Sequence, residues 1–227
     1  MNTSRAALLS LLTISMLVLG CSSTKTVRVA VPPRMDLRPY PVVGIVTFTS
    51  NRNDGEFDRL ATQKFLESVQ AAQPGTRVVE LGSQQEVLAS VGRSNWDPVA
   101  LRAVKAKHEV DALIVGRIDI ERAKPNVAVS TLWKAVSARA DVNVALWARV
   151  FETQSGATMW TDSAKLTTTI ASGDFSKTGG NVAVRDTEAA YGAMIEQMAC
   201  DVTDAFREHY VLRRVSKNDA AYADVRE

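Results

Sequence analysis

The strongest constraint on the fold is a regular alternation of side chains within residues 140–163. Apolar residues recur there at every second position, namely Val142, Val144, Leu146, Ala148 and Val150. This period is that of a β-strand with one buried face. The polar stretch 152–156 ends in Gly156, which can adopt a positive φ, and a second β-prone run follows it. The sequence therefore predicts two antiparallel strands joined by a short turn.

Residues 1–20 have the pattern of an export signal. Arg5 precedes an apolar run of about 14 residues, which is short for a membrane span. The run ends in Gly20-Cys21, which resembles the cleavage box of bacterial lipoproteins, and this resemblance implies that Cys21 is lipidated and becomes the mature N-terminus. Ser22 implies transport to the outer membrane in the same way. The alternative is an uncleaved apolar helix with an incidental cysteine.

The remaining chain is long enough for one domain with a real core. The full sequence has 27 basic and 25 acidic residues, and loss of Arg5 brings these numbers still closer. We therefore expect no nucleic-acid partner on grounds of charge. If Cys21 is lipidated, Cys200 is the only other cysteine, so an intramolecular disulfide is excluded.

Residues 21–41 are predicted to form an extended tether, because they contain Pro32, Pro33, Pro39 and Pro41. The apolar patch at 27–31 is also compatible with an edge strand. At the other end of the chain, residues 212–227 are mostly polar or charged and are expected to be disordered.

Between these ends, residues 42–211 are predicted to form one α/β domain. Its expected elements are a strand at 42–48, a helix at 56–73, a strand at 77–81, helices at 83–91 and 97–108, a strand at 112–120, a connection at 121–137, the two strands described above, a Thr-, Ser- and Gly-rich segment at 165–185 and a last helix at 186–210. Two of the helix starts carry capping signals: Ser83 with Glu86, and Asp97 with Pro98.

This order, with the blocks at 42–48, 77–80, 111–116 and 150–160, resembles a group of bacterial envelope proteins. The group contains the curli-secretion lipoprotein (CsgG) family, the N-terminal domain of TolB and the lipoprotein activator of penicillin-binding proteins (LpoB). The likeness covers residues 42–210 and implies a single-domain sandwich of a mixed sheet with helices, TolB N-terminal or CsgG-like. It also implies a periplasmic, non-enzymatic protein that binds other proteins.

Three functions are implied by this resemblance. The first is an adaptor or assembly factor for a cell-envelope complex, anchored on the periplasmic face of the outer membrane, and we favour it. The second is a subunit of an oligomeric secretion pore, in which the segments 122–139 and 165–185 enter the membrane as hairpins. The third is an activator of peptidoglycan synthesis, although the tether is short for that role.

No motif for catalysis, a cofactor or a metal is recognised in the sequence. The two histidines, His108 and His209, lie far apart in the chain, and the glycine, lysine and threonine of 173–180 have the wrong order for a phosphate-binding loop. We therefore expect no enzyme activity, no cofactor and no metal.

Candidate binding residues are aromatic, with one thiol. Trp147 and Phe151 fall on the odd positions of their strand, opposite the valine face, and Trp133 and Trp160 are expected nearby. This face is either covered by helices or forms an apolar patch for a partner protein. A helical projection places Cys200 with Glu196, Thr203 and Arg207 on a polar face, where an intermolecular disulfide or an inert thiol are both possible.

Overall fold

The computed structural model describes residues 24–52, 55–121, 124–130, 135–176, 179–184 and 186–216. The predicted signal segment, Cys21, Trp133 and residues 217–227 of the predicted tail lie outside these ranges. The chain forms two compact units, one of residues 33–207 and one that joins the N-terminal residues up to 32 to those from 208 onward.

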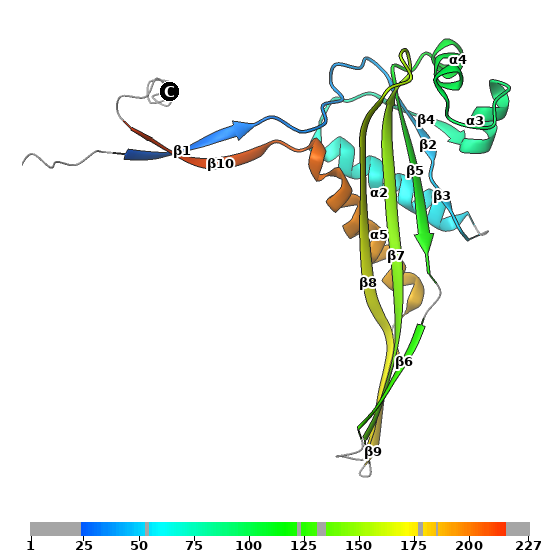
Figure 1. Cartoon of the computed structure of the whole chain (residues 1–227), viewed down its shortest axis with the longest axis vertical. Helices are drawn as coiled ribbons and strands as arrows, with labels where there is room; N and C mark the ends of the chain where they lie inside the picture. The colour runs from blue at the N-terminus through cyan, green and yellow to red at the C-terminus, as the bar shows by residue number, and fades with distance from the viewer. Residues whose placement is uncertain are drawn as a thin grey trace, which may run out of the picture. The chain divides into compact units, whose positions relative to one another are not determined.

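The larger unit contains most of the elements (Figure 1). Its strands are β2 (Val43–Thr47), β3 (Thr49–Ser50), β4 (Val78–Ser83), β5 (Ala112–Ile120), β6 (Lys124–Ser130), β7 (Ala135–Glu152), β8 (Thr158–Ser176) and β9 (Gly179–Val184), and its helices are α2 (Glu56–Ala72), α3 (Gln84–Ser90), α4 (Pro98–His108), α5 (Thr187–Thr203) and the 3-10 turn η1 (Asp204–Phe206).

The strands form one mixed sheet in the order β4-β2-β5-β7-β8-β9, with β3 paired to β5 and β6 paired to β7. Strand β2 runs parallel to β4 and β5, whereas the pairs β5–β7, β7–β8 and β8–β9 are antiparallel. The expected α/β fold with a mixed sheet and helices is thus confirmed.

The predicted pair of strands is the longest part of this sheet. Strands β7 and β8 run antiparallel from Phe151 opposite Thr158 to Val136 opposite Phe175. In the turn, Gly156 has a φ of +78°, and a Cβ atom there would lie 2.6 Å from the Cα of Pro98. Only glycine satisfies both the backbone angle and the close approach to the start of α4.

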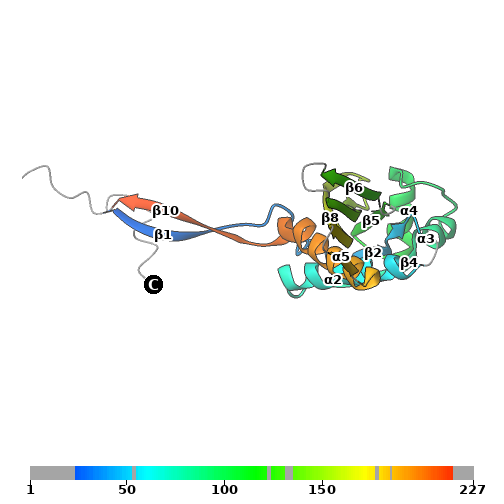
Figure 2. The same ribbon diagram turned by 90° about the horizontal axis from the view of Figure 1, so that it is seen from below.

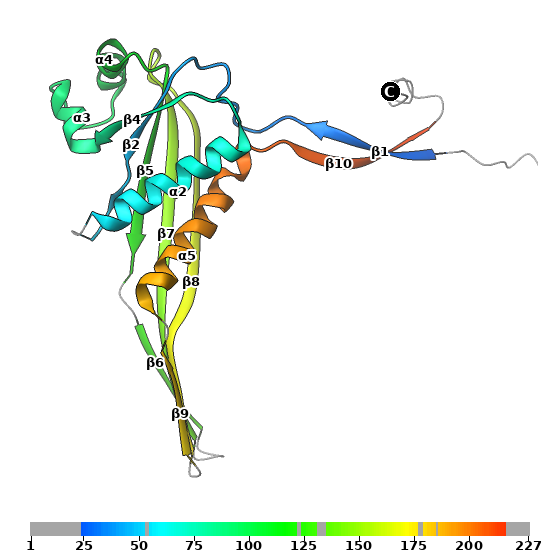
Figure 3. The same ribbon diagram turned by 180° about the vertical axis from the view of Figure 1, so that it is seen from behind.

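Helices α2 and α5 cover one face of the sheet (Figures 2 and 3). The alternating residues of β7 point into this layer, and all five are fully buried, as predicted: Val142, Val144, Leu146, Ala148 and Val150. Phe65 from α2 and Phe206 from η1 meet above the strands with ring centroids 6.3 Å apart. The main core therefore lies between the sheet and this pair of helices.

Helices α3 and α4 cover a smaller part of the opposite face, over a second apolar cluster. Both begin with the predicted caps. The Ser83 side chain accepts a hydrogen bond from the Glu86 N–H, and the Glu86 carboxylate accepts from the Ser83 N–H. Asp97 accepts from the N–H of Ala100 at 2.7 Å.

Trp160 does not lie beside Trp147, contrary to the sequence prediction. It pairs with Val150 across β7 and β8, and side chains of such pairs share a face. Trp160 is therefore in the main core, where its ring lies 4.9 Å from that of Phe206. Trp147 lies on the other face.

Where the structure describes them, both segments that flank the central strands are β-structure. Strand β6 forms within the predicted connection 121–137 and pairs with the start of β7, and β8 extends through 165–176 to pair with β9. The small polar residues of 165–175 follow the register of β7, and the described parts of 122–139 and 165–185 each contain an antiparallel strand pair.

The predicted boundary of the domain at residue 42 is wrong. Met35 and Leu37, within the predicted tether, are buried in the main core. The buried side chain of Gln73 fixes this segment, because its Oε1 accepts from the Leu37 N–H at 2.8 Å and its Nε2 donates to the Met35 carbonyl. The proline-containing segment bends and turns here, with the Tyr40 N–H donating to the Leu37 carbonyl, and its apolar residues are buried instead of lying in solvent.

The last helix is also shorter than predicted. Helix α5 ends at Thr203, and after η1 the backbone of Arg207 is extended. The following residues form strand β10 (His209–Ser216), which includes residues 212–216 of the predicted disordered tail. Tyr210, Val211 and Val215 have high β-propensity, and a strand partner elsewhere in the chain decides their conformation.

That partner is β1 (Thr24–Val31), which forms with β10 the smaller unit. The two strands are antiparallel from Thr24 opposite Ser216 to Val31 opposite His209. The tether thus contains the strand that was the alternative reading of 27–31. We call this unit the β1–β10 ribbon.

One ion pair at the base of α4 predicts a pH dependence of stability. Asp111 accepts hydrogen bonds from the Lys105 ammonium at 2.7 Å and from the Val42 N–H at 3.3 Å. The hydrogen bond from Lys105 is the main reason why the pKa of Asp111 lies below its ordinary value of 3.8. Since the folded pKa is the lower one, the stabilisation is present above pH 3.8 and is lost as the pH falls through the folded value.

We therefore expect Asp111→Asn to lower the free energy of unfolding near neutral pH. The difference from the parent protein should shrink at acidic pH, as the Asp111 carboxylate of the parent becomes protonated below its ordinary value of 3.8. Urea unfolding at the two pH values measures this, with the exposed Asp201→Asn as the control. An equal loss at both pH values would show that the charge of Asp111 is not the cause.

Candidate protein-docking groove

The face of the sheet opposite α2 and α5 is only partly covered by α3 and α4, and a groove lies beside them. Its volume is about 500 Å³. The walls come from β3, α3, the loop before α4, and strands β5, β7 and β8, through Thr49, Gln84, Trp96, Val115, Gly116, Arg117, Asp119, Ala145, Leu146, Trp147, Arg149, Phe151 and Ser163. We call it the Trp147 groove.

The alternation of β7 positions the centre of this groove. Trp147, Arg149 and Phe151 occupy every second position of β7, so their side chains point to the same face of the sheet. The guanidinium carbon of Arg149 lies 4.6 Å from the centre of the Trp147 ring and 5.4 Å from that of Phe151. Arg149 is therefore held between two aromatic rings by cation–π contacts.

Two nitrogen donors of the groove have no acceptor among the described residues. These are Nε of Arg149 and Nε1 of Trp96, and each atom is buried. Buried donors in folded proteins are almost always paired, because an unpaired one costs about 1–3 kcal/mol. Both atoms are shielded from solvent by the surrounding side chains, so they are not donors that the open groove presents to another molecule.

Charged side chains surround this centre. Arg117 and Asp119, neighbours on the same face of β5, form an ion pair at 2.8 Å, with Arg117 exposed and Asp119 partly exposed. Next along the sheet, Lys165 lies 3.7 Å from Glu121. Exposed pairs of this kind add little to stability. Instead, these pairs determine which charges a docking molecule meets at the edge of the groove.

The structure places two of the predicted partner-binding residues in the groove. Trp147 is half-buried in it, and Phe151 is 5% exposed, so Phe151 forms part of the floor. The role of all three predicted aromatic residues in binding, including Trp133, stays a prediction. Arg149 and Trp96 were not predicted. The period of β7 was sufficient to find Arg149, whereas Trp96 reaches the groove only through the folding of the loop before α4.

Cys200 is exposed on α5, as predicted. Thr203 is not beside it in solvent but fully buried, with its hydroxyl 2.5 Å from that of Ser68 on α2. The helical projection missed this because α2 packs along α5 and widens its buried stripe. An intermolecular disulfide through Cys200 stays a prediction, as does lipidation of Cys21.

Within the described residues, no group of three or more His, Cys, Asp and Glu side chains is arranged to hold a metal ion. In the same part of the chain, no helix has both the length and the apolar character needed to cross a membrane.

Comparison with known proteins gives matches to solved structures only. No protein-family model matches the chain, and no curated protein does. The PelC dodecamer from Paraburkholderia phytofirmans is 10% identical, with a TM-score of 0.40 over 81% of this chain and 98% of that one. A neuraminyllactose-binding hemagglutinin homologue from Helicobacter pylori is 11% identical, with a TM-score of 0.43 over 71% of this chain and 81% of that one.

The LpoB C-terminal domain from Salmonella enterica is a further match, 13% identical, with a TM-score of 0.32 over 56% of this chain and 83% of that one. The fold group named from the sequence is thus among the similar structures. At these identities and TM-scores the likeness carries no conclusion about function.

Proposed function

We propose that this chain is a non-enzymatic lipoprotein, anchored through Cys21 to the periplasmic face of the outer membrane, which binds a protein of the cell envelope in its Trp147 groove. It acts there as an adaptor or assembly factor. The observation that carries the proposal is the Arg149 guanidinium held between the rings of Trp147 and Phe151 in a groove of about 500 Å³.

The composition of the groove supports a protein as the ligand. Tryptophan and arginine are the residues that most often dominate the binding energy of protein interfaces, and here they are in contact. The stacking on Trp147 also limits the motion of the Arg149 side chain, so little entropy is lost when it binds. An extended segment of the partner offers carbonyl oxygens that the Arg149 guanidinium can bind.

Site-specific crosslinking in living cells tests this assignment. A photoreactive residue at Ser163, on the groove, should give a defined adduct, whereas one at Glu67, an exposed residue of α2, should not. Addition of Trp147→Ala or Arg149→Ala should reduce the adduct by about 30-fold, the effect of losing one dominant interface residue. Both side chains are half-exposed, so the variants should fold normally.

An adduct that forms equally from Ser163 and Glu67, or that survives both alanine substitutions, would contradict docking in the groove. If the captured protein is a peptidoglycan synthase, the adaptor is an activator of cell-wall synthesis, the third function implied by the sequence. The crosslink is therefore to be identified by mass spectrometry.

A second candidate function is the subunit of an oligomeric secretion pore. The hairpins β6–β7 and β8–β9 favour it, because they occupy the two segments that enter the membrane in the secretion family. Extraction in detergent followed by negative-stain imaging separates the two functions. Rings of many subunits support the pore, and monomers or dimers support the adaptor.

A further inference from the structure

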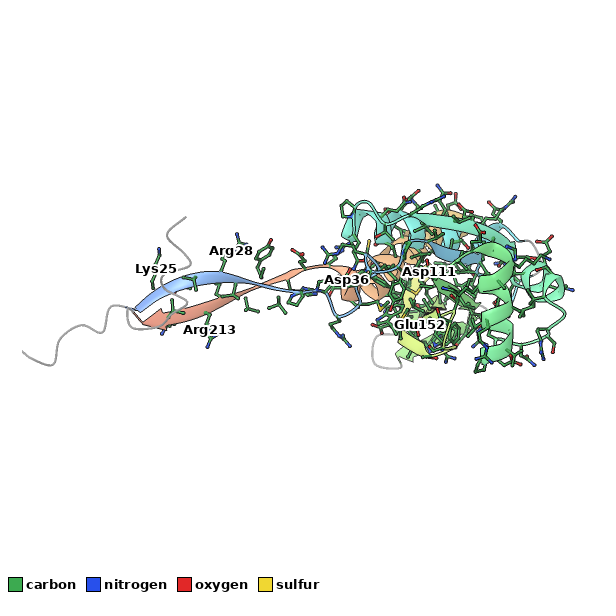
Figure 4. All side chains as sticks on the ribbon, turned by 90° about the horizontal axis from the view of Figure 1, so that it is seen from above. Lys25, Arg28, Asp36, Asp111, Glu152 and Arg213 are labelled. Atoms are coloured by element: carbon green, nitrogen blue, oxygen red, sulfur yellow. The ribbon has the colours of Figure 1, made fainter. Side chains whose placement is uncertain are left out.

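The β1–β10 ribbon is strongly basic. Its two strands have eight residues each and contain Lys25, Arg28, Arg213 and Arg214 but no aspartate or glutamate. The formal net charge of the whole chain is only +2, whereas these four side chains alone contribute four positive charges. None of the four has a carboxylate partner among the described residues. Figure 4 shows Lys25, Arg28 and Arg213 extending from the ribbon.

One face of the ribbon combines this charge with exposed apolar side chains. The register places Arg28 opposite Leu212 and Thr26 opposite Arg214, and cross-strand partners share a face. Leu212 is 72% exposed and Tyr210, on the same face, is 60% exposed. The guanidinium of Arg28 lies 5.5 Å from the centre of the Tyr210 ring. We call this the Arg28 face.

The opposite face differs in burial. It carries Lys25, Arg213 and the exposed Val31 and Val211, but its Val27 and Val215 are only 3% and 1% exposed. The Arg28 face exposes a tyrosine and a leucine beside two arginines, Arg28 and Arg214. This combination suits the boundary between lipid headgroups and acyl chains, where tyrosine is enriched and arginine reaches phosphates while its stem stays in apolar surroundings.

The position of the ribbon in the chain selects the ligand. Only Ser22 and Ser23 separate Cys21 from the first residue of β1. A fully extended chain of this length spans about 11 Å, so a lipid on Cys21 would hold the ribbon at the membrane surface. This step rests on the lipid anchor of the proposed function. Basic residues held at such a surface are attracted to anionic lipids.

We propose that the Arg28 face of the β1–β10 ribbon binds the anionic phospholipid headgroups of the leaflet in which Cys21 is anchored. Arg28 and Arg214 on this face provide the direct attraction, Lys25 and Arg213 on the other face add to the local positive charge, and Tyr210 and Leu212 enter the interface beside Arg28. The interaction adds a second, charge-dependent contact to the lipid anchor, and it weakens as salt screens the charges.

Vesicle binding by the mature chain, residues 21–227 with Cys21→Ser, tests the ribbon without the lipid. We expect co-sedimentation with vesicles that contain phosphatidylglycerol and not with vesicles of phosphatidylcholine alone. The double variant Arg28→Gln, Arg214→Gln should lower the partition coefficient about 25-fold, since each cation at the surface contributes about fivefold. The matched control is Arg93→Gln, Arg102→Gln, which removes two exposed cations from the larger unit.

Three results would overturn the proposal: no binding to either vesicle, equal binding to both, or equal losses in the two double variants. A dimer in solution that Arg28→Gln, Arg214→Gln dissociates, without vesicle binding, would assign the face to a second copy instead. Mass spectrometry of Cys21 in the exported protein tests the anchor separately. An unmodified Cys21 would contradict the lipid anchor of the proposed function. The vesicle experiment would still test lipid binding by the ribbon independently.

Discussion

Replacement of Gln73 by leucine is expected to destabilise the larger unit by roughly 3–6 kcal/mol, because it leaves three buried backbone groups without a partner. Gln73 is 3% exposed. Its amide accepts from the Leu37 N–H at 2.8 Å and donates to the carbonyls of Met35 at 2.6 Å and Phe206 at 2.9 Å. Leucine retains the volume of the side chain but makes none of these bonds.

The effect is large because one side chain joins three segments. Gln73 follows the last residue of α2, Met35 and Leu37 belong to the N-terminal segment, and Phe206 ends η1. Each unpaired group costs about 1–3 kcal/mol. The free energy gained by burying the whole leucine side chain is at most about the cost of one such group. The lost hydrogen bonds therefore outweigh the apolar gain, and the substitution lowers the free energy of unfolding.

Urea unfolding followed by far-UV circular dichroism measures this change, with Gln63→Leu as the control. Gln63 lies on the same helix and its amide donates to Glu67, but it is exposed, so its loss should change the free energy of unfolding by less than about 0.5 kcal/mol. Gln73→Glu separates the two roles of the amide, because a carboxylate can accept from Leu37 but cannot donate. A Gln73→Leu protein as stable as the control would contradict the role assigned to the amide.

The hydrogen bonds of Gln73 to distant segments could not be predicted from the sequence. Local signals were sufficient for the central strands, since the alternation of β7 repeats at the period of a half-buried strand. They were sufficient for the starts of α3 and α4, because a cap depends on residues only three positions apart. Gln73 carries no such signal, because its partners lie more than thirty residues away in the chain.

The pairing of β1 with β10 was not predicted, for the same reason. Its strands pair residues from opposite ends of the chain, such as Val29 with Val211. Neither strand has a neighbour in sequence that would reveal the pairing, and residues 204–210 were compatible with the continuation of α5. Non-local pairing, and not weak β-propensity, explains why this part was read as tether, helix and tail.

The candidate groove was predicted in part. The odd face of β7 was recognised, and with it Trp147, because the face of a residue follows from its parity in the strand. Whether helices cover that face depends on where α3 and α4 pack on the sheet, which their own sequences do not encode. Trp96 enters the groove from outside the strands altogether.

The second large effect is expected at Gly116, where β5 passes beneath Phe48. A Cβ atom on Gly116 would lie 2.5 Å from the Phe48 ring. Phe48 is fully buried, its ring packs against that of Phe65 at 5.1 Å, and its N–H donates to the Thr62 hydroxyl. The ring therefore has little room to move away.

We expect Gly116→Val to destabilise the protein by roughly 3 kcal/mol, the upper end of the usual cost of overpacking. Valine has the higher β-propensity, but that preference is worth at most about 1 kcal/mol. The steric term is thus larger than the propensity term. Gly192→Ala is the control of opposite sign, because no atom lies within 4 Å of the added Cβ in the interior of α5, and alanine should stabilise that helix by up to about 1 kcal/mol.

A double-mutant cycle with Phe48→Leu identifies the cause. Phe48→Leu alone leaves space in the core and lowers stability, but in the Gly116→Val background this space accommodates the new methyl groups. The two losses should therefore add to more than the loss of the double variant, by about 1–3 kcal/mol. If the losses are simply additive, the damage at Gly116 comes from the strand backbone and not from contact with Phe48, and the close packing of β5 against this ring is not what requires glycine.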